Sequence, residues 1–348
     1  MKRDYSLDLM RIISMLCVVI IHFSNYYCRA FNKIDNLNYL GGVIFNSLAR
    51  IAVPIFFMIS GALLIGGNHE SKKYWKRIFK FTWILIIWNL IYYVWNCFYL
   101  GTSTPPFQTI FTSMFEATKA HLWFMYAIIG LYIILPFVQS MVQNMDKEKE
   151  NLFIKLWLFF SGGVHIFRAL LRMININTNL VYNVPIIQGT YYLGYFILGY
   201  ILYKRFTEHK PKINEYCFIT YLSSSLITII TTYIISLSNS TYYESFLAYR
   251  SIFIMISSIA VFILILNNKE LINKSNKLTK FISIVAPTSF GIYLFHIIPF
   301  NILLKNINIL EINSFIGIPI LGIVITIISF LVIYIIKKIP KADKFLGI

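Results

Sequence analysis

His22, His296, Arg11 and Arg50 lie inside long apolar stretches of this chain, where ionisable side chains are rare. His22 follows Arg11 on the first stretch, and His296 lies within the ninth. An imidazole can take a proton from a hydroxyl group near neutral pH, or accept an acyl group itself. A charge at mid-membrane costs about 2.5 to 3.5 kcal/mol on insertion scales, so such residues tend to face the bundle interior and to serve function.

The polar positions of the first stretch fall on one face of the predicted helix. Asp8, Arg11, His22 and Asn25 recur there at helical spacing, with Met15 and Val18 between them on the same face. Helical geometry brings Arg11 and His22 to within about 20° around the axis and puts His22 about 16 Å further along it. A lone His is often only a hydrogen-bonded packing residue, and an Arg can reach the headgroups. Their common stripe favours a functional pair.

The second stretch carries a cation beside a proline. Asn46, Arg50, Pro54, Phe57 and Gly61 share a face. Pro54 has no N–H, so it leaves the carbonyl of Arg50 without its helical partner and bends the helix. A bend next to a buried cation can shape a cavity, which favours function for Arg50. Pro54 and Gly61 are better explained by packing.

The ninth stretch has a polar stripe of its own. Ser289, Tyr293 and His296 are spaced i, i+4 and i+7, so their side chains line one face. Two imidazoles inside the membrane are harder to attribute to packing than a single one.

Polar and aromatic residues also open the fourth stretch. His121 and Trp123 stand at its outer boundary, where Trp is commonly an interfacial anchor. Glu116, one turn earlier, either orients a His or is a solvated loop acid, and the second explanation is the simpler.

Several familiar chemistries have no motif in this chain. The sequence contains no GxxxxGK[ST] loop, no HExxH and no GxSxG, which argues against nucleotide hydrolysis and zinc chemistry. The four cysteines are far apart and are predicted to be packing residues. No metal is expected.

Ten long apolar runs must position these groups. With 58% hydrophobic and 13% charged residues, the chain has the composition of a membrane protein. A bilayer core needs roughly 20 apolar residues per helix. The runs are Leu7 to Cys28, Leu40 to Ile65, Ile78 to Leu100, His121 to Val142, Leu152 to Phe167, Ile187 to Tyr203, Glu215 to Leu237, Phe246 to Leu266, Pro287 to Leu304 and Phe315 to Ile336. We therefore predict an all-α, polytopic integral membrane bundle of about ten transmembrane helices.

The net charge of +17 would suggest a nucleic-acid partner for a soluble protein, but membrane topology explains it better. If the N-terminus lies inside, most Lys and Arg fall on cytoplasmic segments, and both termini are cytoplasmic. The first run is expected to be a retained helix, not a cleaved signal. Residues 1–340 form the predicted transmembrane domain, and residues 341–348 a short basic cytoplasmic tail. The outer connection that begins at Arg168 is either a docking loop or a plain surface loop.

Together these motifs resemble acyltransferase family 3, multi-span bacterial enzymes that move acyl groups from acyl-CoA to cell-surface sugars. The resemblance covers most of the chain. It rests on Leu7-Asp8 with Arg11 and His22, on Arg50, Pro54, Phe56-Phe57 and Ser60-Gly61, on His121-Leu122-Trp123-Phe124, and on Ser289, Tyr293 and His296. Between the second and third runs the family often has two Arg and a Pro, whereas this chain has Arg77, Lys80 and Trp83.

The resemblance implies an O-acetyltransferase of the bacterial cytoplasmic membrane, with acetyl-CoA or another acyl-CoA as donor and a glycan or lipid-linked saccharide as acceptor. It implies catalytic roles for His22, Arg50 and His296, and donor binding by Arg11, Arg77 and Lys80. It implies acceptor contacts for Asp8, Glu116, His121, Trp123, Ser289 and Tyr293. Membrane lipids are the other expected partners, nucleic acid is not expected, and a homo-oligomer is left open.

Two alternatives are a transporter or flippase for a glycan or lipid-linked sugar, and a non-catalytic membrane scaffold. Interior Arg and His also mark transport pathways. A transporter of the usual kind has repeated halves with broken helices in corresponding positions, and the sequence shows no such pairing. A scaffold leaves the aligned polar stripes unexplained.

Overall fold

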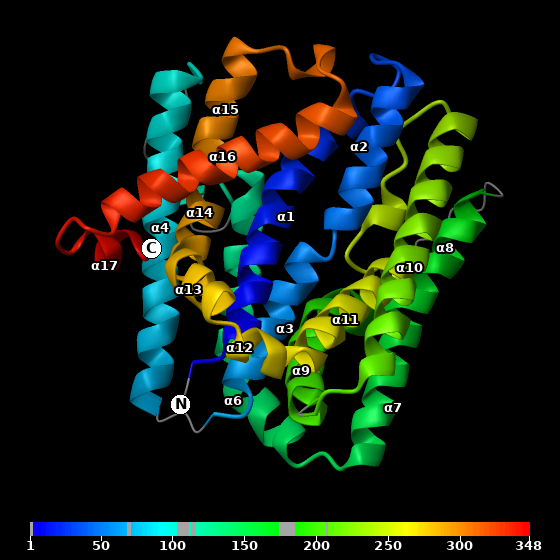
Figure 1. The fold of residues 1–348 in the computed structure, drawn as a ribbon, viewed down its shortest axis with the longest axis vertical. Helices are drawn as coiled ribbons and strands as arrows, with labels where there is room; N and C mark the ends of the chain where they lie inside the picture. Colours follow the sequence, from blue (N-terminus) through cyan, green and yellow to red (C-terminus); the bar gives the residue numbers. More distant parts are fainter. Residues whose placement is uncertain (1–2, 68–70, 103–110, 113–115, 174–184, 207) are drawn as a thin grey trace.

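The computed structural model describes residues 3–67, 71–102, 111–112, 116–173, 185–206 and 208–348 of the chain (Figure 1). Every regular element in these ranges is helical. The longer helices are α1 (Tyr5–Arg29), α2 (Asn36–Ala49), α3 (Ala52–Leu64), α4 (Ser71–Tyr99), α6 (Trp123–Gln143), α7 (Lys147–Trp157), α8 (Val164–Met173), α9 (Pro185–Arg205), α10 (Pro211–Ser238), α11 (Ile252–Asn267), α13 (Asn276–Val285), α14 (Ser289–Phe295), α15 (Ile297–Asn306) and α16 (Ser314–Ile336). Two short helices are α12 (Lys269–Lys274) and α17 (Ala342–Leu346).

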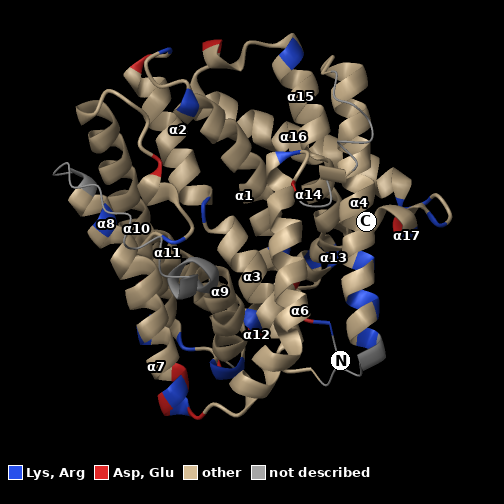
Figure 2. Cartoon of the chain, turned by 180° about the vertical axis from the view of Figure 1, so that it is seen from behind, with Lys and Arg blue, Asp and Glu red and all other residues tan. Residues whose placement is uncertain are grey.

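The helices confirm a polytopic membrane protein. Within the described ranges, 9 helical segments are long and apolar enough to cross a bilayer. They correspond to nine of the ten predicted runs, and α9 coincides with the remaining one, Ile187 to Tyr203. Large apolar side chains point outward, as a lipid solvent allows, with Phe98 87% and Phe137 77% exposed. Lys and Arg gather at the lower end of α4, on the same side of the molecule as the N-terminus (Figure 2).

Helix α1 lies at the centre of the bundle. It contacts α2, α3, α11, α12, α13, α14 and α16. Figure 1 shows it enclosed by the other helices, with α16 crossing it obliquely. The polar stripe of α1 is therefore surrounded by protein, which is the environment that buried ionisable groups require.

Local sequence explains where several of these helices begin. Asp4 caps α1 by accepting a hydrogen bond from the backbone N–H of Ser6. Asp35 and Asp146 cap α2 and α7 in the same manner. Asx and Ser caps satisfy the N–H groups that a helix leaves without partners at its start.

The second span is broken at Arg50, as Pro54 predicts. Helix α2 ends at Ala49 and α3 begins at Ala52, within one apolar stretch. Below the break, α3 packs very closely on α9. A Cβ atom added at Gly61 would lie 1.6 Å from the carbonyl oxygen of Phe196, and one at Gly199 would lie 2.0 Å from that of Met58. Small residues thus let the two backbones touch.

Two predicted runs differ from the structure. The run Leu152 to Phe167 is not one regular helix, because a π-helical segment, Leu158–Gly163, joins α7 to α8. The run Pro287 to Leu304 is also interrupted, and the span it belongs to begins earlier, at Asn276. A turn at His296 separates α14 from α15, because Pro299 cannot donate to the carbonyl four residues back.

The last residues fold back against the bundle. The indole N–H groups of Trp83 and Trp88 donate to the carbonyls of Phe345 and Leu346, at 3.1 and 3.0 Å. Ile348 is 8% exposed and packs beside Gly291 of α14. The segment predicted as a basic tail is thus packed along α4, where Figure 1 shows the C-terminus.

Candidate active site

Three histidines from separate helices meet in the middle of the bundle, and we call them the histidine cluster. His22 comes from α1, His121 from the short 3₁₀ helix Ala120–Leu122 before α6, and His296 from the turn after α14. The ring centroids lie 5.0 Å apart for His22 and His296, 5.3 Å for His121 and His296, and 6.4 Å for His22 and His121. The structure therefore brings together two residues predicted as catalytic and one predicted to bind the acceptor.

Backbone carbonyls set the tautomers of two members of the cluster. The Nδ1 atom of His296 lies 2.7 Å from the carbonyl oxygen of Tyr293, and the Nε2 atom of His121 lies 3.4 Å from that of Leu294. A carbonyl only accepts, so each of these nitrogens carries the hydrogen. The opposite nitrogens, Nε2 of His296 and Nδ1 of His121, keep lone pairs without a hydrogen-bond partner in the described part of the chain.

His22 differs from the other two in its accessibility. His121 and His296 are 5% and 0% exposed, whereas His22 is only half-buried. In the described part of the chain, no backbone carbonyl holds its ring, in contrast to His121 and His296. Of the three imidazoles, His22 is the one best able to meet a substrate.

Aromatic side chains hold the cluster in place. The hydroxyl of Tyr293 donates to the backbone carbonyl of His121, and its ring lies 5.6 Å from that imidazole. The hydroxyl of Tyr92 on α4 donates to the carbonyl of Leu294 at 2.6 Å, and its ring lies 5.2 Å from His121. These contacts tie α4, α6 and α14 together around the imidazoles.

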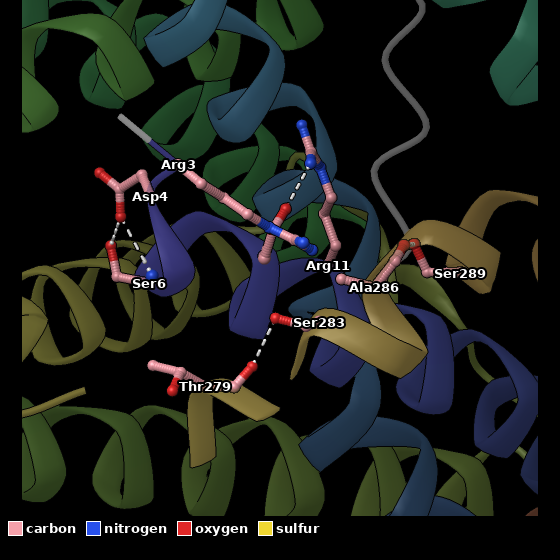
Figure 3. Close-up of polar contacts among 9 residues, drawn as sticks. Arg3, Asp4, Ser6, Arg11, Thr279, Ser283, Ala286 and Ser289 are labelled. Atoms are coloured by element: carbon pink, nitrogen blue, oxygen red, sulfur yellow. Dashed lines mark hydrogen bonds and ion pairs between the residues drawn. The ribbon is translucent and has the colours of Figure 1, made fainter. Parts of the chain in front are cut away.

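A cavity of about 430 Å³ approaches the cluster from the side of Arg11, and we call it the Arg11 cavity. Its lining runs from Arg11 on α1, past Ser289, to Phe124 and Tyr293 next to the cluster. Figure 3 shows Arg3 and Arg11 near the start of α1, with Ala286 and Ser289 close to Arg11. The predicted stripes of α1 and of the ninth run thus face the same space.

Arg11 is held by a carboxylate within this space. Its Nη1 atom lies 2.6 Å from Oδ1 of Asp8, whose Oδ2 is 2.7 Å from Nε of Arg3. Asp8 therefore orients two guanidinium groups, and its contact with the acceptor stays a prediction. Ser289 lines the cavity but donates its own hydroxyl to the carbonyl of Ala286.

A second hollow, of about 450 Å³, adjoins the Arg11 cavity and shares Arg11, Leu63, Ala286 and Pro287 with it. At its edge, Lys269 lies 2.6 Å from the Asp4 carboxylate, which also accepts a hydrogen bond from Tyr203 at 2.7 Å. Burial alone would raise the pKa of Asp4, but hydrogen bonds from Lys269, Ser6 and Tyr203 outweigh it and leave the pKa below its ordinary value. The ion pair between Asp4 and Lys269 thus lies at the edge of this second hollow.

Arg50 lies apart from the Arg11 cavity. It lines a separate pocket of about 320 Å³, which we call the arginine pocket because Arg168 and Arg250 line it too. The Nε atom of Arg50 donates to Oδ1 of Asn46 at 2.6 Å, and its guanidinium sits 5.5 Å from the ring of Tyr249. The sequence identified Arg50 but not the pocket.

An aromatic stack connects the arginine pocket with the histidine cluster. The ring of Tyr249 lies 5.9 Å from that of Trp123, and Trp123 lies 5.1 Å from Tyr192. Trp123 is two positions beyond His121 in the chain. Trp123, predicted to contact the acceptor, thus lies between the two regions.

Three other predicted residues are further from the cluster. Arg77 has its guanidinium 5.9 Å from the ring of Tyr132, which lines the Arg11 cavity. Lys80 is exposed on α4, and the side chain of Glu116 is exposed in the loop before α6. Arg77 thus adjoins a lining residue of the cavity through its contact with Tyr132.

Sequence reasoning missed three residues of the arginine pocket. His165 and Arg168 come from α8, and Arg250 from the segment before α11. The only signal was that all three are ionisable groups at or near the ends of apolar runs. Such positions are common for cations that reach the headgroups, so the sequence did not single them out.

The arrangement places an imidazole that can act as a base near two separate cavities, the Arg11 cavity and the arginine pocket. The described residues contain no group of three or more His, Cys, Asp or Glu with the geometry to hold a metal ion. Imidazole and guanidinium groups suit proton transfer and the stabilisation of negative charge at an attacked carbonyl.

The comparison with protein families agrees with this chemistry. A family model described as an acyltransferase domain matches residues 4–336, which is nearly the whole chain. No curated protein and no solved structure matches the chain.

Proposed function

The chain belongs to acyltransferase family 3, and on that premise we propose that it moves an acetyl group from acetyl-CoA to a hydroxyl group of a cell-surface or lipid-linked glycan. Family membership and membrane-spanning helices together make the protein a membrane acyltransferase. The choice of acetyl-CoA over another acyl-CoA, the glycan acceptor and the bacterial cytoplasmic membrane are parts of the proposal.

The observation that carries the proposal is the half-buried imidazole of His22 beside two buried ones, which lie next to Tyr293, a lining residue of the Arg11 cavity. Arg11 offers a guanidinium at the opposite end of the same cavity. An acyl-CoA can therefore set its phosphates at the cationic end while its thioester reaches the imidazoles. Arg77, next to Tyr132, is a second cation for the donor, whereas Lys80 has less support because it lines none of the described cavities.

The transfer step then runs as a direct attack on the thioester. His22 takes the proton of the acceptor hydroxyl while the hydroxyl oxygen attacks the carbonyl carbon, and a C–O bond forms. The C–S bond breaks, CoA leaves as a thiolate, and the proton on His22 passes to that sulfur. The products are an ester and the free thiol of CoA.

The other two imidazoles support this step without exchanging protons. His121 and His296 each give their ring hydrogen to a carbonyl and keep a lone pair. These lone pairs stabilise the imidazolium that His22 becomes during the attack. Arg50, which approaches from the arginine pocket, supplies positive charge on the acceptor side.

A label-transfer assay tests the proposal. Membranes that contain the protein are incubated with [¹⁴C]acetyl-CoA, and the label is followed into cell-surface glycan. We expect incorporation by the wild type and its loss, by about a hundredfold or more, in His22→Ala, because general bases typically contribute 10²- to 10⁴-fold. Expression and membrane insertion should stay intact.

His209→Ala is the matched control. His209 is an exposed imidazole in the connection before α10, bound to the carbonyl of Asn267, and its loss should leave incorporation unchanged. Wild-type activity in His22→Ala would remove His22 from the mechanism. Transport of an unmodified glycan without any label would favour the transporter instead.

A further inference from the structure

The arginine pocket has a strongly cationic lining. Among the described lining residues, three guanidinium groups, of Arg50, Arg168 and Arg250, accompany His165 and one carboxylate, that of Glu244. Arg168 is 5% exposed, whereas Glu244 is an exposed residue and thus screened by solvent. The pocket therefore favours an anionic occupant.

Arg50 makes this preference stronger because of its depth. It lies at the break between α2 and α3, in the middle of an apolar span. Its contacts are the amide oxygen of Asn46 and the ring of Tyr249, and it forms no ion pair with any carboxylate in the described part of the chain. A cation at this depth is costly unless a negative group compensates it.

The backbone of the pocket is rigid on the side of α8. His165 Nε2 lies 2.8 Å from the carbonyl oxygen of Ser245, which belongs to the short 3₁₀ helix Ser245–Leu247. This contact ties α8, the carrier of Arg168, to the segment that carries Arg250. A fixed set of guanidinium forks is suited to the paired oxygens of a phosphate or carboxylate.

The arginine pocket is separate from the Arg11 cavity. Its described lining residues include none of those of the Arg11 cavity. It connects with the cluster through the stack of Arg50, Tyr249 and Trp123. A molecule held here lies on the acceptor side of His22 if the donor occupies the Arg11 cavity.

We propose that the arginine pocket binds an oxyanion, a phosphate or carboxylate, of the acyl acceptor. The inference rests on the proposed function and narrows its substrate class to glycans that carry a negative charge, either as an acidic sugar or through a phosphate link. Arg168 and Arg250 hold the oxyanion, and the sugar ring lies toward Trp123 and Tyr249.

Binding is tested first, with no donor present, on the full chain purified in a neutral maltoside detergent. The probes are octyl N-acetylglucosaminyl phosphate, octyl glucuronide and the neutral octyl N-acetylglucosaminide, and the readouts are the dissociation constant and the shift in melting temperature. The two anionic probes should bind at least about tenfold more tightly than the neutral one, and this preference should fall with salt. Equal binding of all three would overturn the inference.

Variants separate the pocket from general surface charge. Arg168→Gln and Arg250→Gln should each weaken the anionic probes by about tenfold and leave the neutral probe unchanged. Arg250 is only partly buried, so its variant keeps the test valid if Arg168→Gln does not fold. Lys33→Gln removes an exposed cation between α1 and α2 and should change nothing. Equal loss for all probes would give the arginines a structural role only.

Two further experiments show whether the bound anion belongs to the acceptor or to a lipid, and which of the two proposals a negative result contradicts. If phosphatidylglycerol displaces the anionic probes at equal concentration, the pocket belongs to a lipid headgroup and the acceptor assignment is wrong. With [¹⁴C]acetyl-CoA added, both Arg variants should raise the KM for anionic acceptors and leave the KM for acetyl-CoA unchanged. Selective binding without any label transfer would count against the proposed function alone, because binding is measured without the donor.

Discussion

At the scale of single residues, Arg11 shows how a positive charge is held in place inside a membrane bundle. Asp8 orients it, and Arg3 binds the other oxygen of the same carboxylate. Removal of Arg11 therefore leaves Asp8 with a partner, so a substitution there reports on the donor more than on folding.

Arg11→Ala should raise the KM for acetyl-CoA by about tenfold, since a hydrogen bond between charged groups is worth about 1.5 to 3 kcal/mol and the site is partly solvated. Arg11→Lys should give an intermediate value, because it keeps the charge and loses the fork. Initial rates across a range of acetyl-CoA concentrations measure both. An unchanged KM in Arg11→Ala would place the donor phosphates elsewhere.

The residue scale is also where prediction from the sequence worked best. Helical spacing alone put Arg11 and His22 on one stripe, and the structure has one at the start of the cavity and the other in the cluster. His121 gave only a weak signal at a span boundary. Its position depends on contacts from Tyr92 and Tyr293, which are distant in the chain and follow no local pattern.

At the scale of helices, the packing of α3 on α9 positions much of the Arg11 cavity. Helix α3 supplies Ser60 to the lining, and Gly61 lies tightly against the backbone of α9. The predicted assignment of Gly61 to packing has its physical basis here: the backbone of α9 occupies the space that a side chain would need.

Gly61→Ala should lower the melting temperature, because overpacking in a tight contact costs about 1 to 3 kcal/mol. Gly130→Ala is the matched control. Gly130 is also inside a helix, and an added Cβ there meets no atom within 4 Å. It should leave stability unchanged or raise it by up to about 1 kcal/mol through helix propensity. Thermal unfolding of the purified variants measures both, and equal melting temperatures would contradict the proposed contact.

Helix irregularities were only partly predictable. The break between α2 and α3 was predicted from Pro54, because a proline lacks a backbone N–H wherever it occurs and this can be read from the sequence alone. The π segment Leu158–Gly163 had no such sign, since it depends on how Gly162 packs against Ile252 and Met255 of α11. The arginine pocket was missed for the same reason, because α8 and the segment before α11 meet only through tertiary structure.

At the scale of the molecule, the N-terminus is pinned to α12 by Asp4 and Lys269. The pKa of Asp4 lies below 3.8, so its contribution to stability is complete above that pH and is lost as the pH falls through the folded-state pKa. Burial alone would lower the pKa of Lys269, but its bonds to Asp4 and Tyr203 hold it above 10.5. That contribution is present below 10.5 and is lost as the pH rises through the folded-state value.

The difference in melting temperature between wild type and Asp4→Asn should therefore be constant from about pH 5 to pH 9 and should shrink below about pH 4. Melting curves in a series of buffers measure it. A difference that changes with pH near neutrality would mean that another group titrates with this pair. In that case, the ion pair of Asp4 and Lys269 would also contribute to the pH dependence of the enzyme near neutrality.

The two approaches to the histidine cluster have described linings with no residue in common, and packed rings of imidazole and tyrosine stand between them. Under the proposed function, an acyl group passes between two bound molecules in this region, and neither molecule itself crosses the bundle. Under the same proposal, the cell modifies a glycan without moving the acyl donor through the protein.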